Sequence, residues 1–544
     1  MRFNDLVAGC VMVIYILIVV EWSGALEIRV STATGHDNKS CLLSSASGPC
    51  KTVGFALNAM EDEENHNQTL FIFQIEDHIH SLDKRINISQ TNPRRGIVLQ
   101  SSHANGSIIR CTDVSAGFDI GSRVTQIRQD KTRNISIENL KFQQCGPRFA
   151  ATVLIWNSVK INFRNCVFEH NKQAGINAFD SEVTIESCIF QNNTSNGRNS
   201  SEKFKEGFTS AGGAAGFLFR TSVPLSVVIT NSTFTFNSAV TNDSASYIAP
   251  SSNVSHFTAG GGGLLVVFLK KTEHCRAVIE DSKFSNNSAT YGGGFYFADS
   301  NSASKNNLSI IGSHFVRNRA GQCGGGLIFS QWDNASSITS VIRNCTVKEN
   351  KARRGAGVNV FLMNYDDKPN DSVLRFDNVV FSDNRGDAST AIRFTTALPY
   401  GSTMDVTPEF INCKIENHNM SSIARTSPFT SQRVNVRFQG SNIFQRNYGG
   451  GAGSFQDCVL HVEGQLVFAN NTGSHGGALF LQSSQMILYP GSELMFLGNK
   501  ADGIGGAILV WENIMSEFIH EFNPNCFLAY SVHYLPPSKW KVSS

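Results

Sequence analysis

A short signature recurs along this chain: Phe-x-x-Asn, followed by a glycine pair or triplet and an apolar run. In the two clearest copies with a glycine triplet, Phe284 and Asn287 precede the glycines at 292–294, and Phe315 and Asn318 precede those at 324–326. In the two clearest copies with a glycine pair, Phe468 and Asn471 precede Gly476 and Gly477, and Phe496 and Asn499 precede Gly505 and Gly506. Self-similarity at a period of roughly 20–50 residues indicates a solenoid or a related repeat array. The signature constrains the fold more than the length does, because each repeat buries its apolar face only against its neighbours.

Weaker copies of the signature extend through most of the chain. Asn171 follows Phe168 and Asn193 follows Phe190 at the same spacing, whereas Ile415 leads to His418. The first position of the signature falls at Phe142, Phe168, Phe190, Phe234, Phe284, Phe315, Val347, Phe381, Ile415, Phe444, Phe468, Phe496 and Phe522. The copies are unevenly spaced, which fits a coil of short strands whose extra residues bulge outward at one corner.

One unit of the repeat contains three extended runs, at 478–482, 485–489 and 493–497, separated by Ser483-Ser484 and Pro490-Gly491. Serine, proline and glycine between apolar runs predict turns. Three strands per coil, stacked coil on coil, predict an all-β parallel β-helix, and the handedness of parallel crossovers favours the right-handed form. About thirteen coils at ~4.8 Å each predict a rod of roughly 60 Å.

Each residue of the signature has an expected role in such a coil. The phenylalanines stack in the core as a ladder of rings. The asparagines adopt left-handed backbone angles and hydrogen-bond their own backbone, so that a stack of them satisfies a buried turn. The glycines supply positive φ at a tight corner. These residues are therefore predicted to be structural.

The N-terminus predicts a secretory signal peptide. An apolar run at 6–20 is shorter than the ~20 residues that span a bilayer, and small residues follow at Ser23 and Ala25. Cys41 and Cys50 precede a helical pattern at 52–60, and we expect a disulfide-stapled helix that caps the open end. The predicted organisation is a signal peptide at 1–25, a cap and first irregular coils at 26–135, the repeat domain at 136–525, and a tail or minimal cap at 526–544.

Two further features agree with secretion. Removal of Cys10 with the signal peptide leaves twelve cysteines, an even number that suits an oxidising compartment. Glycosylation sequons are abundant, although Asn-rich repeat turns account for part of them: Asn38, Asn67, Asn87, Asn105, Asn134, Asn192, Asn193, Asn199, Asn231, Asn242, Asn253, Asn286, Asn307, Asn334, Asn344, Asn370, Asn419 and Asn470. We expect an extracellular glycoprotein with no membrane-spanning segment after the signal peptide.

The pairing of Phe-x-x-Asn with Gly-Gly-Ala and an aliphatic residue, seen at 476–479 and 505–508, resembles the repeat of the polymorphic outer-membrane proteins. These are autotransported bacterial adhesins with related extracellular proteins in animals. The resemblance covers about 139–525 and implies a pectin-lyase-like, right-handed β-helix that serves as a surface rod in adhesion. The sequons favour the animal branch.

The sequence predicts no catalytic residue, cofactor or metal site. The acidic residues do not line up in the repeat, and His78 and His80 alone make a poor metal site on what reads as a solvated strand face. The net charge is only +2 and the basic residues are scattered, which argues against nucleic acid as a partner. The main hypothesis is a non-catalytic scaffold for a protein or glycan ligand. The competing hypothesis is a polysaccharide lyase or hydrolase, since enzymes of both kinds use this fold.

Arg385-Gly386-Asp387 is the sharpest short motif in the chain. It directly follows the signature copy at 381–384, so we expect it at the solvent-facing turn where other coils carry their glycines. A receptor of the integrin type is one reader of such a tripeptide. The alternative is that Gly386 is simply the glycine of the repeat.

Overall fold

The fold is known from a computed structural model of the chain. It describes residues 25–42, 48–62, 70–88, 96–113, 116–121, 134–146, 151–157, 160–197, 212–241, 260–269, 272–299, 303–331, 337–362, 371–396, 406–420, 427–504 and 506–511. The predicted signal peptide, the predicted tail, Phe522 and Gly505 lie outside these residues.

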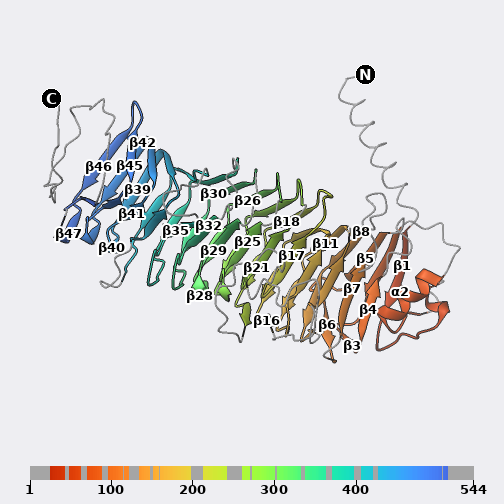
Figure 1. Ribbon diagram of the computed structural model, residues 1–544. Coiled ribbons are helices and arrows are strands. Elements are labelled where there is room, and N and C mark those ends of the chain that lie inside the picture. Colours follow the sequence, from red (N-terminus) through yellow and green to blue (C-terminus); the bar gives the residue numbers. More distant parts are fainter. Residues whose placement is uncertain are drawn as a thin grey trace, which may run out of the picture.

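The described chain forms a parallel β-helix, as the repeat predicts. The coils stack from β1 (Ala25–Val30) at one end to β48 (Ile508–Trp511) at the other, and Figure 1 shows them as an elongated rod. One sheet contains 14 strands, from β4 (Arg85–Ile88) to β48, and a second contains 27 strands that follow two faces of the coil. All the strand pairs within these sheets are parallel. The regular pairing begins with β1 and β2 (Leu70–Ile75), ahead of the clear repeats.

Seven of the described coils have a strand at a fourth position where the sequence predicted three, and others, such as the coil of β30 (Thr339–Arg343), β31 (Thr346–Lys348) and β32 (Val358–Leu362), have the predicted three. One coil consists of β26 (Asn307–Ile311), β27 (His314–Val316), β28 (Arg319–Cys323) and β29 (Leu327–Gln331). The unexpected strand is β28, which lies between the signature asparagine and the glycines. This strand was not predicted because its sequence carries no apolar run.

The fourth strands stack in columns of their own. One sheet consists of β16 (Thr194–Gly197), β20 (Ser238–Thr241), β24 (Ser288–Tyr291) and β28. Another consists of β40 (Tyr448–Gly449), β43 (Thr472–His475) and β47 (Lys500–Ile504). Single bridges from Arg319 to Lys351 and from Lys351 to Arg385 continue the first column.

The signature phenylalanines stack in register through the core. Phe284 lies directly beside Phe315 in adjacent strands, and their ring centroids are 4.8 Å apart. Parallel stacking at 4.7–5.3 Å also joins Phe168 with Phe190, Phe190 with Phe234, Phe234 with Phe284, and Phe468 with Phe496. Val347 and Ile415 occupy the same register in their coils. The spacing of the rings follows the spacing of the strands, so each ring packs on the side chain at the same position of the neighbouring coils, which in most coils is another ring.

The signature asparagines form a second ladder, of hydrogen bonds. The Nδ2 of Asn318 donates to the Phe284 carbonyl at 2.9 Å and to Oδ1 of Asn350 at 3.0 Å. The backbone N–H of Asn318 donates to the same Oδ1 at 2.9 Å. The ladder runs through Asn171, Asn193, Asn237, Asn287, Asn318, Asn350 and Asn384, and resumes at Asn447, Asn471 and Asn499.

These bonds correct one expectation about the asparagines. Each side chain bonds the backbone and side chain of neighbouring coils rather than its own backbone. The left-handed residue is the one before the ladder asparagine, such as Asn286 (φ 55°), Arg317 (φ 57°) or Asn470 (φ 54°). A stacked amide has matching partners above and below, so its best bonds are to other coils.

The glycines make the next corner of the coil. Gly476 has φ 65°, as expected for a corner glycine. A Cβ on Gly477 would lie 2.3 Å from the carbonyl oxygens of Gly506 and Lys500, so this position has no room for a side chain.

A helix lies at the N-terminal end of the rod, as expected. The helix α2 (Val53–Asp62) begins at Thr52, whose Oγ1 accepts the N–H of Phe55 at 3.1 Å as an N-cap. Val53 and Leu57 are buried in the core of the rod. Cys41 and Cys50 form a disulfide with Cα atoms 5.1 Å apart, next to this helix. In the described part of the chain, no helix combines the length and apolarity needed to cross a membrane.

Asn318→Ala tests the contribution of the amide ladder. The substitution leaves the Phe284 carbonyl without its donor and two donors of Asn287 without their acceptor, all buried. We expect the free energy of unfolding to fall by about 3 kcal/mol, because each unsatisfied buried group costs about 1–3 kcal/mol. Denaturant unfolding of the variant measures this loss. Asn162→Ala, at a half-exposed position of β11 (Lys160–Arg164), is the control and should change stability by less than about 0.5 kcal/mol.

His418→Asn tests the one interruption of the ladder. His418 is fully buried, with Nδ1 and Nε2 each 3.3 Å from a backbone carbonyl, and a neutral imidazole can donate to only one of them. Burial lowers the pKa of His418 from 6.5 to about 4. The unfolded chain therefore takes up the proton first as the pH falls, and stability is lost between about pH 6.5 and 4.

Asparagine at position 418 can continue the ladder and does not titrate. We expect this variant to be about 1–2 kcal/mol more stable at pH 7. Its advantage should widen by on the order of 3 kcal/mol between pH 6.5 and 4. Urea unfolding of both proteins across this range measures the difference, and parallel pH profiles would contradict the assignment.

Candidate ligand-binding groove

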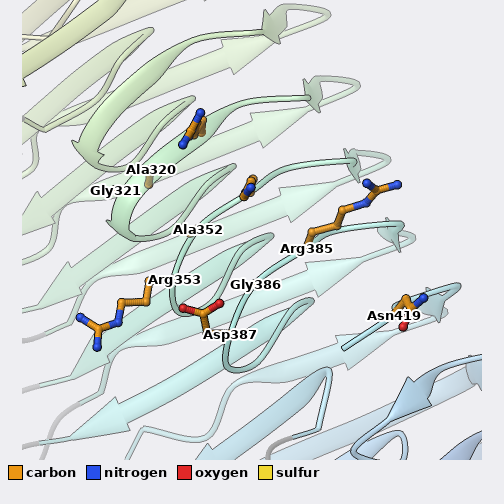
Figure 2. Close-up of a pocket in the computed structure, with 10 residues that line it drawn as sticks. Ala320, Gly321, Ala352, Arg353, Arg385, Gly386, Asp387 and Asn419 are labelled. Carbon is orange, nitrogen blue, oxygen red and sulfur yellow. The ribbon is translucent and has the colours of Figure 1, made fainter. Parts of the chain in front are cut away.

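A depression on the described surface lies along the column of fourth strands. It has a volume of about 630 Å³ and spans four successive coils. Its lining, shown in Figure 2, consists of Arg319, Ala320, Gly321, Lys351, Ala352, Arg353, Arg385, Gly386, Asp387 and Asn419. The lining therefore includes four basic side chains and one carboxylate. We call this depression the basic groove.

Three of the cations stand directly one above another. Arg319 bridges to Lys351 and Lys351 bridges to Arg385, so they occupy one register position on consecutive coils, ~4.8 Å apart. Each directly follows a ladder asparagine, which fixes the backbone from which it projects. All three residues are exposed, and within the described chain their side chains make no ion pair or hydrogen bond.

The floor of the groove is made of small residues. Ala320 and Ala352 are buried and pack with Ala356 in a small apolar cluster. Gly386 continues this line, and a Cβ there would lie 2.5 Å from the Ala352 carbonyl oxygen. In Figure 2 the side chains of Arg353 and Arg385 point in opposite directions, with Asp387 between them. The small floor leaves the cationic side chains accessible along its length.

The position of Arg385-Gly386-Asp387 differs from the expectation. The motif lies in the column of fourth strands, where the N–H of Arg385 donates to the Asn350 carbonyl and that of Asp387 to the Arg353 carbonyl. The corner glycine of neighbouring coils, Gly355, is aligned instead with Ser389, which has φ 52°. The proposal that Gly386 is the repeat glycine, and that the motif forms the glycine turn, is therefore wrong. The motif is part of the shaft and contributes Arg385 to the groove.

Several other outward charges of the rod are neutralised between coils. Arg375 pairs with Glu409 at 2.7 Å, and Arg437 faces Glu409 from the other side and pairs with Glu463. Further pairs join neighbouring coils: Lys141 with Glu169, Arg164 with Glu186, and Arg343 with Asp377. These alternating signs contrast with the uniform sign of the column formed by Arg319, Lys351 and Arg385.

The carboxylates do not form a hydrolytic or lyase-type pair in the groove. Glu349 and Asp383 lie within 4.0 Å of Lys348, but on an exposed corner outside the groove lining. The hydrogen bond from Arg317 lowers the pKa of Glu349, which keeps this group ionised and unsuited to act as an acid. Asp180 has a pKa raised by burial, but it pairs with Arg220 at 3.0 Å away from the groove.

The sheet of 14 strands offers little open surface in its middle part. Every residue of β21 (Leu264–Phe268), β29 and β32 (Val358–Leu362) is buried, on the outward face as well as the inward one. Strands buried on both faces are rich in apolar residues, as β21 is throughout and β29 and β32 are in most positions. A substrate groove across these strands would need this outward face to be exposed.

Among the described residues, the histidines and free cysteines are not arranged as a reactive centre. His80 is buried against Asp77 at 3.0 Å, which corrects its expected place on a solvated strand face. Among the described residues no group of three potential metal ligands is present. Seven described cysteines are buried thiols, including Cys166 and Cys188, and burial raises the pKa of Cys345 to about 12. A thiol with such a pKa is inert as a nucleophile.

Sequence reasoning missed the groove and one disulfide. The basic residues follow the signature asparagine in three successive copies, so the pattern is visible once this position is known to lie on a strand. The disulfide between Cys111 and Cys145, with Cα atoms 4.9 Å apart, joins coils whose spacing the weak early repeats did not define.

Comparison with known proteins supports the fold. Residues 84–253 match the family model described as "Right handed beta helix region". No curated protein matches the chain significantly. The solved complex of alginate lyase AlyF-OU02 with G6 aligns over 90% of this chain and 94% of that one, with 9% identity and a TM-score of 0.24, which is too low to carry an argument. Over residues 84–253 the chain is thus similar to right-handed β-helix proteins.

Proposed function

We propose that this protein is an extracellular, non-catalytic β-helix scaffold that recognises a ligand through its basic groove. The single observation that carries the proposal is the stack of three exposed cations without partners among the described residues, in a molecule that pairs charges of opposite sign between several other coils. Exposed, unpaired charges in a depression favour binding of a ligand of opposite charge. The single carboxylate in the groove argues against paired acid–base catalysis there.

The same proposal includes an origin among extracellular repeat proteins. The Phe-x-x-Asn and Gly-Gly-Ala pattern supports kinship with proteins that carry polymorphic outer-membrane protein-type repeats, in the animal branch that the sequons favour. The disulfides Cys41–Cys50 and Cys111–Cys145 support an oxidising compartment.

Secretion has a site-specific consequence for glycosylation. Asn192 and Asn470 are exposed left-handed corner residues within sequons, whereas Asn193 is a fully buried ladder residue within the adjacent, overlapping sequon. We expect N-glycans at Asn192 and Asn470, and none at Asn193. Glycopeptide mass spectrometry of the protein secreted from animal cells measures occupancy. A folded product that carries glycan on Asn193, or retention of the protein inside the cell, would contradict the proposal.

The absence of catalysis is tested with a panel of extracellular polysaccharides. We expect the purified protein to bind at least one acidic polysaccharide and to release no shortened chains or unsaturated sugars from any of them. Chromatography of the chains and absorbance of unsaturated products measure turnover. Clear turnover, reduced by substitution of a single carboxylate, would overturn the scaffold in favour of a lyase or hydrolase.

A further inference from the structure

We propose that the basic groove binds an acidic polysaccharide whose sulfate or carboxylate groups lie along the column formed by Arg319, Lys351 and Arg385. This inference rests on the proposed function and adds the class of ligand. The ligand chain runs parallel to the axis of the rod, across successive coils, because the cations repeat in that direction.

The first argument is the unrelieved repulsion within the column. Like charges directly opposite one another on neighbouring strands are destabilising. In the pairing of Arg375 with Glu409, and of Glu409 with Arg437, an anion separates two cations. In the groove, Lys351 occupies the middle position instead, so binding of an external anion would relieve the repulsion.

The second argument is the spacing. A cation projects from each coil at intervals of ~4.8 Å, and the three together span about 10 Å. This arrangement matches a chain that carries an anionic group on successive units better than a single compact anion. Arg319 and Arg385 each offer a planar guanidinium, which binds sulfate or carboxylate through two parallel hydrogen bonds.

The third argument concerns the rest of the lining. None of its residues is aromatic, and its floor consists of alanine and glycine. Single-stranded nucleic acids are held largely by stacking of successive bases on aromatic side chains, which this groove does not offer. In the coil after Arg385 the equivalent position is Asn419, whose strand partner is Tyr448 with 48% of its surface exposed. The column thus ends in a neutral amide and one exposed ring, beyond the anion-binding part.

The experiment compares two triple variants of the full-length secreted protein. The groove variant is Arg319→Gln with Lys351→Gln and Arg385→Gln. The control variant is Arg276→Gln with Lys283→Gln and Lys305→Gln, which removes the same net charge from exposed positions outside the groove. Titration calorimetry at about 0.15 M salt, near physiological ionic strength, uses heparin oligosaccharides as the sulfated probe, oligogalacturonate as the carboxylated probe and an oligodeoxythymidine as the nucleic acid.

We expect the groove variant to bind the preferred acidic oligosaccharide at least roughly tenfold more weakly, and the control variant within about twofold of the wild type. The slope of log Kd against log salt should be about 2 smaller for the groove variant, since three ionic contacts are lost. The melting temperature of the unliganded groove variant should equal or exceed that of the wild type, because repulsion is removed. The probe that binds more tightly, heparin or oligogalacturonate, identifies sulfate or carboxylate as the recognised group.

The outcomes separate this inference from the proposed function. Oligosaccharide binding that is equally strong in the groove variant would overturn the groove as the site and leave a ligand-binding scaffold standing. If the protein bound the oligodeoxythymidine more tightly than both saccharides, the proposed ligand class would be wrong and a nucleic acid would be favoured instead. Equal weakening of binding in both triple variants would mean that the net charge of the protein alone determines the affinity, and would also overturn the basic groove as the binding site. Cleavage of the probe would overturn the proposed function itself.

Discussion

The architecture depends on hydrogen bonds that link each coil to the next through a buried asparagine. Asn318 alone bonds four groups of the neighbouring coils with its side-chain amide, and the same pattern continues at Asn350. A coil has no core of its own, so its polar corner must be satisfied by the coils above and below. The rings of Phe284 and Phe315 stack on the same principle, with apolar faces in place of amides. The rod is therefore a set of one-residue ladders, each continuous over several coils.

This construction separates stability from recognition. The interior ladders determine the residue type at a few positions in each coil. The outward positions between them are free to vary. On other faces that freedom is used for alternating charges, as between Arg343 and Asp377. In the basic groove the alternation fails over three coils, while the asparagines beneath the cations are held by the ladder. A rigid backbone thus presents a row of charges that the protein itself leaves without counter-charges among its described residues.

The sequence predicts the interior far better than the exterior. Phe-x-x-Asn repeats because the same two positions are buried in nearly every described coil, and the copies in which Val347 or Ile415 replaces phenylalanine also fall in register. The direction of the asparagine bonds was wrong because a single sequence reports local turn preferences and not the neighbour in the next coil. The fourth strand was missed because β28 has no apolar run. The column formed by Arg319, Lys351 and Arg385 was missed for the same reason. These residues are about 30 positions apart in the sequence, and their common position becomes visible only after the coils are aligned.

The most direct test of this account is the structure of the protein bound to an acidic oligosaccharide about six sugars long. The account predicts that the chain lies along the axis of the rod, with its anionic groups within hydrogen-bonding distance of Arg319, Lys351 and Arg385, on an unchanged backbone. An oligosaccharide bound on a different face, with these three side chains left exposed to solvent, would contradict it.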